Sequence, residues 1–157
     1  MNIGIIGLGK MGFNLSKNLI KHGHNVIAFD TNNDVIDEIS NEGAIPAYSI
    51  KEVCEKLEGR KIIWLMVPNG APVDSVISEL LPNINKKDII IDGGNSNYKE
   101  SIRRNKELRE KEVDFIDCGT SGGISGALNG ACLMVGGDNE PVKYCDQIFT
   151  GRAVKEG

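Results

Sequence analysis

Apolar residues along the chain form two kinds of pattern that follow one another in turn. Short, nearly continuous apolar runs are typical of buried strands, and they span residues 2–6, 25–29, 61–67, 88–92, 113–117 and 131–136. Between them, apolar residues at helical spacing predict helices near residues 15–20, 35–39, 50–57, 72–81, 99–112 and 140–149, with an extended piece at 44–47. In the highly charged segment 99–112, Ile102 and Leu108 are the predicted inward positions. Helices that join successive apolar strands predict an α/β fold, with a Rossmann-like, doubly wound and mainly parallel sheet in one domain over residues 1–157.

The first predicted strand runs directly into a glycine-rich turn, Gly7-Leu8-Gly9-Lys10-Met11-Gly12. A G-x-G-x-x-G spacing between a strand and a helix is the fingerprint of a dinucleotide site. Gly7 allows the tight turn, Gly9 lets the backbone approach a pyrophosphate, and Gly12 lets the helix and strand pack closely. The free N–H groups at the start of the helix then face the phosphates.

The second predicted strand ends at Phe29-Asp30, where the fingerprint places an acidic residue that binds the adenosine ribose. A carboxylate there repels the 2′-phosphate of NADP by about 3 kcal/mol, at roughly 5 Å and an effective dielectric constant near 20. None of residues 31–33 is basic, so the sequence favours NAD over NADP. The alternative is that Asp30 caps the next helix, but Asn32 or Asp34 could do that.

Three further strand ends lead into polar, glycine-containing loops, at residues 66–70, 92–97 and 117–123. Ligands of open α/β sheets lie outside the carboxyl ends of the strands, so these loops are predicted to border the nucleotide crevice. The Asn95 amide offers a donor and an acceptor to a substrate hydroxyl or carboxylate, since Ser96 or Asn97 suffices to cap the following helix. The clustered glycines of the last loop let backbone N–H groups converge on an anion such as a carboxylate.

Composition narrows the function classes further. Lys and Arg number 18 against 22 Asp and Glu, and the net charge of -4 argues against a nucleic-acid-binding surface. No run is long and apolar enough to span a membrane, and no basic segment precedes the first apolar run, so we expect a cytoplasmic protein. The cysteines are widely spaced, which predicts reduced, buried thiols and neither disulfides nor a metal site; they are Cys54, Cys118, Cys132 and Cys145.

These motifs together resemble the β-hydroxyacid dehydrogenase superfamily and, more closely, its 6-phosphogluconate dehydrogenase family. The resemblance covers essentially the whole chain and is carried by residues 7–12, Met66-Val67-Pro68, Asp92-Gly93-Gly94-Asn95-Ser96, Gly119-Thr120-Ser121-Gly122-Gly123 and Leu133-Met134-Val135-Gly136-Gly137. The Asp-Gly-Gly-Asn-Ser element discriminates, because hydroxyisobutyrate-type relatives have Ser and Thr there. Asp30-Thr31 resembles the NAD-preferring branch, whereas NADP-dependent members typically carry Asn-Arg-Thr.

The resemblance implies oxidative decarboxylation of 6-phospho-D-gluconate to ribulose 5-phosphate and CO₂ with reduction of NAD, in an enzyme that forms homodimers or larger assemblies. It implies substrate contacts from Asn95, Ser121, Gly122 and Gly123. The implied cofactor contacts come from Gly7, Leu8, Gly9, Lys10, Met11, Gly12, Asp30, Thr31, Val67, Pro68 and Asn95.

The family's catalytic base is a lysine in a Lys-x-x-His-Asn-Gly-x-Glu stretch, which does not occur in these 157 residues. We expect it beyond Gly157, together with the family's all-helical domain, so no catalytic residue is assigned and no turnover by this chain alone is expected. Two other interpretations remain open. One is a dehydrogenase or reductase of another small β-hydroxy acid, and the other is a non-catalytic nucleotide-binding module.

Overall fold

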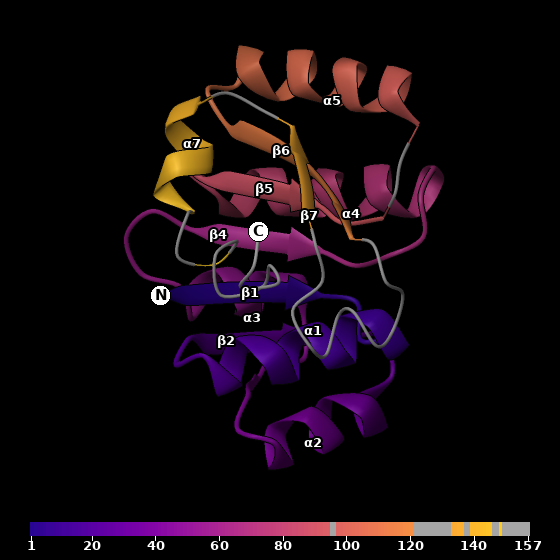
Figure 1. Cartoon of the computed structure of the whole chain (residues 1–157), viewed down its shortest axis with the longest axis vertical. Helices are drawn as coiled ribbons and strands as arrows, with labels where there is room; N and C mark the ends of the chain where they lie inside the picture. The colour runs from indigo at the N-terminus through magenta and orange to yellow at the C-terminus, as the bar shows by residue number, and fades with distance from the viewer. Residues whose placement is uncertain (95–96, 121–132, 137–138, 146–147, 149–157) are drawn as a thin grey trace.

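The computed structural model describes residues 1–94, 97–120, 133–136, 139–145 and 148. One seven-stranded sheet runs through the molecule in the order β3-β2-β1-β4-β5-β6-β7, with helices on both faces (Figure 1). The strands are β1 (Asn2–Ile6), β2 (Asn25–Phe29), β3 (Ile45–Pro46), β4 (Ile62–Leu65), β5 (Ile89–Asp92), β6 (Asp114–Thr120) and β7 (Leu133–Gly136). The pairs from β3 to β6 are all parallel, so the predicted doubly wound sheet is confirmed.

Two hydrophobic clusters cover the two faces of this sheet, because successive side chains of each strand point to opposite sides. On one face lie α1 (Lys10–Lys21), α2 (Asn33–Asn41) and α7 (Asn139–Tyr144). On the other lie α3 (Ile50–Glu55), α4 (Ala71–Leu80), a 3₁₀ turn (Leu81–Asn83) and α5 (Tyr98–Glu110). In β4, Trp64 faces the first cluster while Ile63 and Leu65 face the second, which explains the continuous apolar run of this strand.

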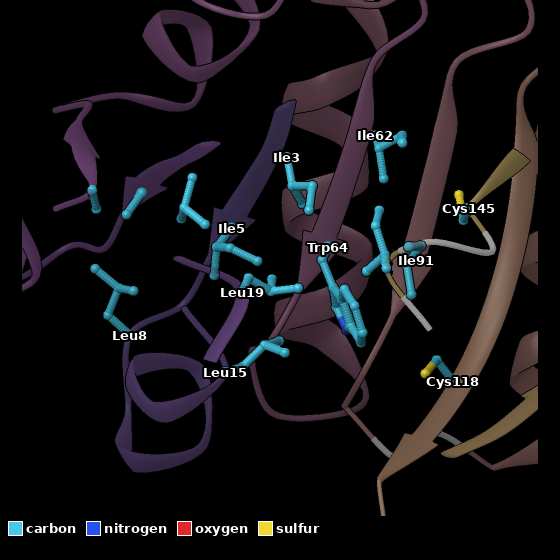
Figure 2. Packing of buried hydrophobic residues seen from close by; sticks show 14 of the residues in the cluster. Ile3, Ile5, Leu8, Leu15, Leu19, Ile62, Trp64, Ile91, Cys118 and Cys145 are labelled. Carbon is cyan, nitrogen blue, oxygen red and sulfur yellow. The ribbon is translucent and has the colours of Figure 1, made fainter. Parts of the chain in front are cut away.

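Trp64 lies in the middle of the first cluster, between Leu15 and Leu19 of α1 on one side and Ile91 of β5 on the other (Figure 2). Its side chain is fully buried under the carboxyl half of the sheet. The core therefore extends to the strand ends, and it supports the loops that leave them.

Helix boundaries follow the local signals in the sequence. Pro72 lies in the first turn of α4, and Gly23 has a positive φ of 88° just after α1. The side chain of Asn32 caps α2 by accepting from the Asp34 N–H group, and that of Asn97 caps α5. These are capping roles that the sequence assigned to Asn32 and Asn97 as candidates.

One expectation about the second half of the chain was wrong. Ile102 is 63% exposed, and Arg104 takes its inward place on α5, because the buried Asp92 carboxylate and the partly exposed Asp74 carboxylate partner the guanidinium. The helix predicted over 140–149 is present as α7 up to Tyr144, and residue 148 is helical again, with Cys145 and Ile148 both buried. The last strand, β7, pairs antiparallel to β6, which agrees with the predicted mainly parallel sheet because an edge strand can be added in the antiparallel direction.

Candidate functional site

A pocket of about 500 Å³ opens at the carboxyl ends of the central strands. Its walls come from the β1–α1 turn, the end of β2 and the loops after β4 and β5. The lining residues are Gly7, Gly9, Lys10, Met11, Gly12, Asp30, Thr31, Met66, Val67, Pro68, Gly93 and Gly94. A ligand crevice in an open α/β sheet is expected at this place.

The glycine turn forms the floor of this pocket. Gly7 has a φ of 103°, which L side chains rarely adopt, and its N–H group donates to the Phe29 carbonyl at 2.9 Å. A Cβ atom on Gly12 would overlap the Gly7 carbonyl oxygen, so α1 crosses β1 as closely as the sequence motif predicts. A Cβ atom on Gly9 would meet no atom within 4 Å, because this position faces the open pocket.

The N-terminus of α1 differs from those of its neighbours. Its N-cap residue is Gly9, which has no side chain to accept a hydrogen bond, and its first turn contains no acidic residue. By contrast, α2, α3 and α5 are capped by Asn32, Ser49 and Asn97 and carry an acidic residue in the first turn. The first N–H groups of α1 are therefore left to an anion in the pocket, which is the environment a pyrophosphate needs.

Asp30 binds the glycine turn from the end of β2. Its Oδ2 atom accepts from the Leu8 N–H group at 2.7 Å, and its Oδ1 atom accepts from the Asn32 N–H group at 2.9 Å. The Oδ1 atom also accepts from the Thr31 hydroxyl at 3.5 Å, whereas the Oδ2 atom has a second lone pair that can accept a hydroxyl donor from the pocket side. The link to Leu8 joins residues 22 positions apart, and no local sequence pattern indicates it.

The loops after β4 and β5 are pressed against each other on the far wall of the pocket. A Cβ atom on Gly93 would overlap the Met66 sulfur and lie 2.6 Å from the Trp64 Nε1 atom. A Cβ atom on Gly94 would lie 2.6 Å from the Val67 carbonyl oxygen. Gly94 is thus needed for close contact with the Val67 backbone and Gly93 for close contact with the Trp64 and Met66 side chains, roles in addition to any ligand contact.

Two carboxylates lie next to each other below this wall. Asp92 ends β5 and is paired in register with Asp117 of β6. The Asp92 Oδ1 atom accepts from the Gly94 N–H group at 2.9 Å, and its Oδ2 atom lies 3.5 Å from the Arg104 Nη1 atom. Burial, and then the neighbouring Asp92 charge, raise the pKa of Asp117 above its ordinary value.

Asp117→Asn is expected to stabilise the fold at neutral pH. A raised folded-state pKa means that the folded protein binds this proton more tightly than the unfolded chain, so stability is lost as the pH rises through the Asp117 pKa. The advantage of the variant should therefore vanish in acid, below the ordinary pKa of aspartate. Urea unfolding of both proteins, from neutral pH to below the ordinary pKa of aspartate, measures the difference in their free energies of unfolding. A difference that does not change with pH would contradict a cause in the Asp117 charge.

Most of the predicted cofactor residues meet in this pocket. Of that set, Gly7, Gly9, Lys10, Met11, Gly12, Asp30, Thr31, Val67 and Pro68 line it, while Leu8 is buried and contributes its N–H group to Asp30. The predicted substrate residues Asn95, Ser121, Gly122 and Gly123 lie outside the described residues. Met66, Gly93 and Gly94 were not predicted as site residues, although each lies in a motif that carried the family resemblance.

The cysteines in the described part of the chain, Cys54, Cys118 and Cys145, are buried, as predicted. Burial raises the pKa of the Cys54 thiol to about 11 and that of Cys145 to about 12, so neither is a nucleophile at neutral pH. Within the same described residues, no group of three or more His, Cys, Asp or Glu could hold a metal ion. No helix found there is long and apolar enough to cross a membrane.

Comparisons with known proteins agree with this geometry. A family model described as the NAD binding domain of 6-phosphogluconate dehydrogenase matches residues 2–155. The chain is 42% identical over 155 residues to the NAD(+)-dependent, decarboxylating 6-phosphogluconate dehydrogenase of Haloferax volcanii, covering 96% of this chain and 51% of that protein. It is also similar to the solved structure of Plasmodium falciparum 6-phosphogluconate dehydrogenase, described in apo form and in complexes with NADP+ and 6-phosphogluconate. That match has a TM-score of 0.91 at 31% identity and covers 100% of this chain and 35% of that one.

The fold is shared more widely than the family. Mycobacterium tuberculosis 3-hydroxyisobutyrate dehydrogenase, solved with L-serine, superimposes with a TM-score of 0.88 at 24% identity, covering 97% of this chain and 52% of that chain. The chain spans between 31% and 52% of the length of the curated relatives it matches. Since the family model covers nearly every residue, the chain belongs to the family of NAD-binding domains of 6-phosphogluconate dehydrogenase.

Proposed function

We propose that this chain binds NAD as the dinucleotide domain of an oxidoreductase that oxidatively decarboxylates 6-phosphogluconate. The observation that carries the proposal is the pocket at the strand ends, where the uncapped N-terminus of α1 and the Asp30 carboxylate face the same space. NAD would supply a hydride acceptor there. The residues of the chain bind and orient it, and the open position in front of Gly9 fits a pyrophosphate pressed against the backbone.

The order of the strands gives the orientation of the dinucleotide. Asp30 ends β2, on one side of β1, so it would accept hydrogen bonds from the adenosine ribose. The loops after β4 and β5 lie on the other side of β1, and Val67 and Pro68 would border the nicotinamide. The pyrophosphate would then cross the start of α1, where the helix dipole and free N–H groups favour negative charge.

The substrate assignment rests on the family. We propose that Asn95, Ser121, Gly122 and Gly123 contact the sugar acid, since their loops follow β5 and β6 at the same edge of the sheet. Removing a hydride from a carbinol carbon requires a base at its hydroxyl. We assign no base within these 157 residues, because the Lys-x-x-His-Asn-Gly-x-Glu stretch does not occur in them. The family would supply that base from elsewhere in the enzyme.

Two further properties belong to this proposal. A cytoplasmic location is supported by the free, buried thiols of Cys54 and Cys145. Assembly of the whole enzyme into homodimers follows from the family resemblance.

The coenzyme preference provides the test. Titration calorimetry of this chain is expected to give tighter binding of NADH than of NADPH, by about a hundredfold for one like-charge repulsion at Asp30. Asp30→Ala should weaken NADH binding, because the ribose hydroxyls lose their acceptor, and should reduce the preference. Asp30→Arg should reverse it. The matched control is Asp34→Ala, an exposed carboxylate in the first turn of α2.

Each outcome bears on a separate part of the proposal. Equal affinity for the two coenzymes in the unsubstituted chain would contradict the preference for NAD. An Asp34→Ala variant as weak as Asp30→Ala would contradict the position of the ribose. Failure to bind either coenzyme would contradict the proposed function itself.

A further inference from the structure

One arginine is buried beneath the far wall of the pocket. Arg104 lies on α5, and its side chain is 1% exposed. Among the described residues outside its own helix, its guanidinium contacts the Asp74 carboxylate, 2.9 Å from Nε, the Gly70 carbonyl, 3.2 Å from Nη2, and the Asp92 carboxylate, 3.5 Å from Nη1. A guanidinium presents its donors in a rigid fork, so one side chain can hold several partners in a fixed arrangement.

Two of these partners, Gly70 and Asp92, flank the two loops that form the wall, and the third, Asp74, lies in the first turn of α4. Gly70 ends the loop after β4, two residues after Pro68, and is the N-cap of α4 with a positive φ of 87°. Asp92 is the last residue of β5, and its other oxygen accepts from the Gly94 N–H group at the start of the following loop. Arg104 therefore connects the two loops from behind, without lining the pocket itself.

We propose that Arg104 is a positioning residue for the nicotinamide half of the dinucleotide, which it serves by fixing the loops after β4 and β5 relative to each other. This inference rests on the proposed function, since that function places the nicotinamide against these loops. The adenosine half lies over β2, where Asp30 and the glycine turn are held by hydrogen bonds that do not involve Arg104. Loss of the Arg104 guanidinium contacts is thus expected to weaken binding of the nicotinamide half and to leave binding of the adenosine half unchanged.

A purely structural role makes a different prediction. If Arg104 only stabilised α5, its replacement would lower the stability of the whole domain and leave the relative affinities of the two halves of the ligand unchanged. Comparing NADH with AMP separates the two roles, because AMP occupies only the adenosine half.

The experiment uses a matched pair of substitutions on neighbouring residues. Arg104→Lys keeps the positive charge beside Asp92 but cannot reach all three partners. Arg103→Lys is the control, because Arg103 also binds Asp74 but contacts neither Gly70 nor Asp92 in the described structure. Titration calorimetry should show NADH binding weakened about tenfold in Arg104→Lys, with AMP binding within about twofold of the unsubstituted chain. Arg103→Lys should leave both affinities unchanged.

A second variant covers the case in which Arg104→Lys does not fold. Asp74 is about 42% exposed, so Asp74→Asn should preserve the fold while it weakens the contact with the Arg104 guanidinium. It should also weaken NADH binding, but by less than Arg104→Lys does. Equal weakening of NADH and AMP, or no weakening of NADH in either folded variant, would overturn the inference and leave the proposed function standing. If the unsubstituted chain binds AMP and NADH with equal affinity, or binds neither, the nicotinamide half makes no measurable contact with these loops, and this contradicts the inference about Arg104.

Discussion

Gly12→Ala is expected to destabilise the domain, whereas Gly9→Ala, three positions earlier in the same motif, is expected to weaken dinucleotide binding strongly with little loss of stability. A Cβ atom on Gly12 would overlap the Gly7 carbonyl oxygen and lie 3.1 Å from the Met66 Cβ atom. The overlapped atom belongs to the backbone, so α1 must move away from β1 to make room. The expected cost is about 3 kcal/mol, a fall of roughly 6–12 °C in the unfolding midpoint.

Gly9 presents the opposite case. Its backbone angles, φ -64° and ψ -175°, are open to any residue, and a Cβ atom there meets no atom within 4 Å. The free energy of unfolding of Gly9→Ala should therefore stay within about 0.5 kcal/mol of that of the unsubstituted chain. The new methyl group would occupy the space proposed for the pyrophosphate, and NADH binding should weaken about a hundredfold, as for two lost charge-assisted hydrogen bonds.

Thermal unfolding by circular dichroism and NADH titration on both variants measure the two effects separately. A Gly9→Ala variant that binds NADH normally would place the pyrophosphate elsewhere. A Gly12→Ala variant as stable as its parent would contradict the close approach of α1 to β1. Since the two substitutions are identical in chemistry, each serves as the control for the other.

The architecture was predictable because it follows from local patterns. Strands that are buried on both faces, such as Ile62–Leu65, read as continuous apolar runs whatever their neighbours. The glycine spacing and Asp30 then predicted that the nucleotide binds at the carboxyl ends of the strands, because the strand, the turn and the helix of this motif follow one another within a few residues. These features need no knowledge of distant parts of the chain.

What sequence reasoning missed depends on partners far apart in sequence. Arg104 is buried because Asp74 and Asp92 lie 30 and 12 positions away and meet it only in the folded sheet. Without them, its helix reads as a charged surface helix with Ile102 inward. The two glycines after β5 suggested a ligand loop, but their contacts with Trp64 and Val67 come from the neighbouring strand. In the described residues, long-range polar contacts were the least predictable feature.

Asp88→Ala is expected to have the largest effect on stability, with a loss of about 3–5 kcal/mol in the free energy of unfolding. Asp88 is 2% exposed at the amino end of β5. Its Oδ1 atom accepts from the Lys61 N–H group at 2.9 Å, and its Oδ2 atom accepts from the Asn85 N–H group at 2.7 Å and lies 3.6 Å from the Lys61 ammonium. Removal of the carboxylate leaves the buried Lys61 N–H group, the buried Lys61 ammonium and the N–H group of the exposed Asn85 without this partner.

The Asp88 interactions lie at the amino ends of the strands, whereas the pocket lies at their carboxyl ends. Folded Asp88→Ala protein should therefore bind NADH with unchanged affinity. Urea unfolding measures the stability, and the matched control is Lys86→Ala, which removes the exposed Lys86–Glu112 ion pair two residues away. That pair is open to solvent on both sides, and its loss should leave the unfolding midpoint unchanged. Equal destabilisation by the two substitutions would mean that burial contributes nothing to the Asp88 interactions. Weaker NADH binding by folded Asp88→Ala protein, with no such change in Lys86→Ala, would show instead that the amino ends of the strands influence the pocket at the carboxyl ends.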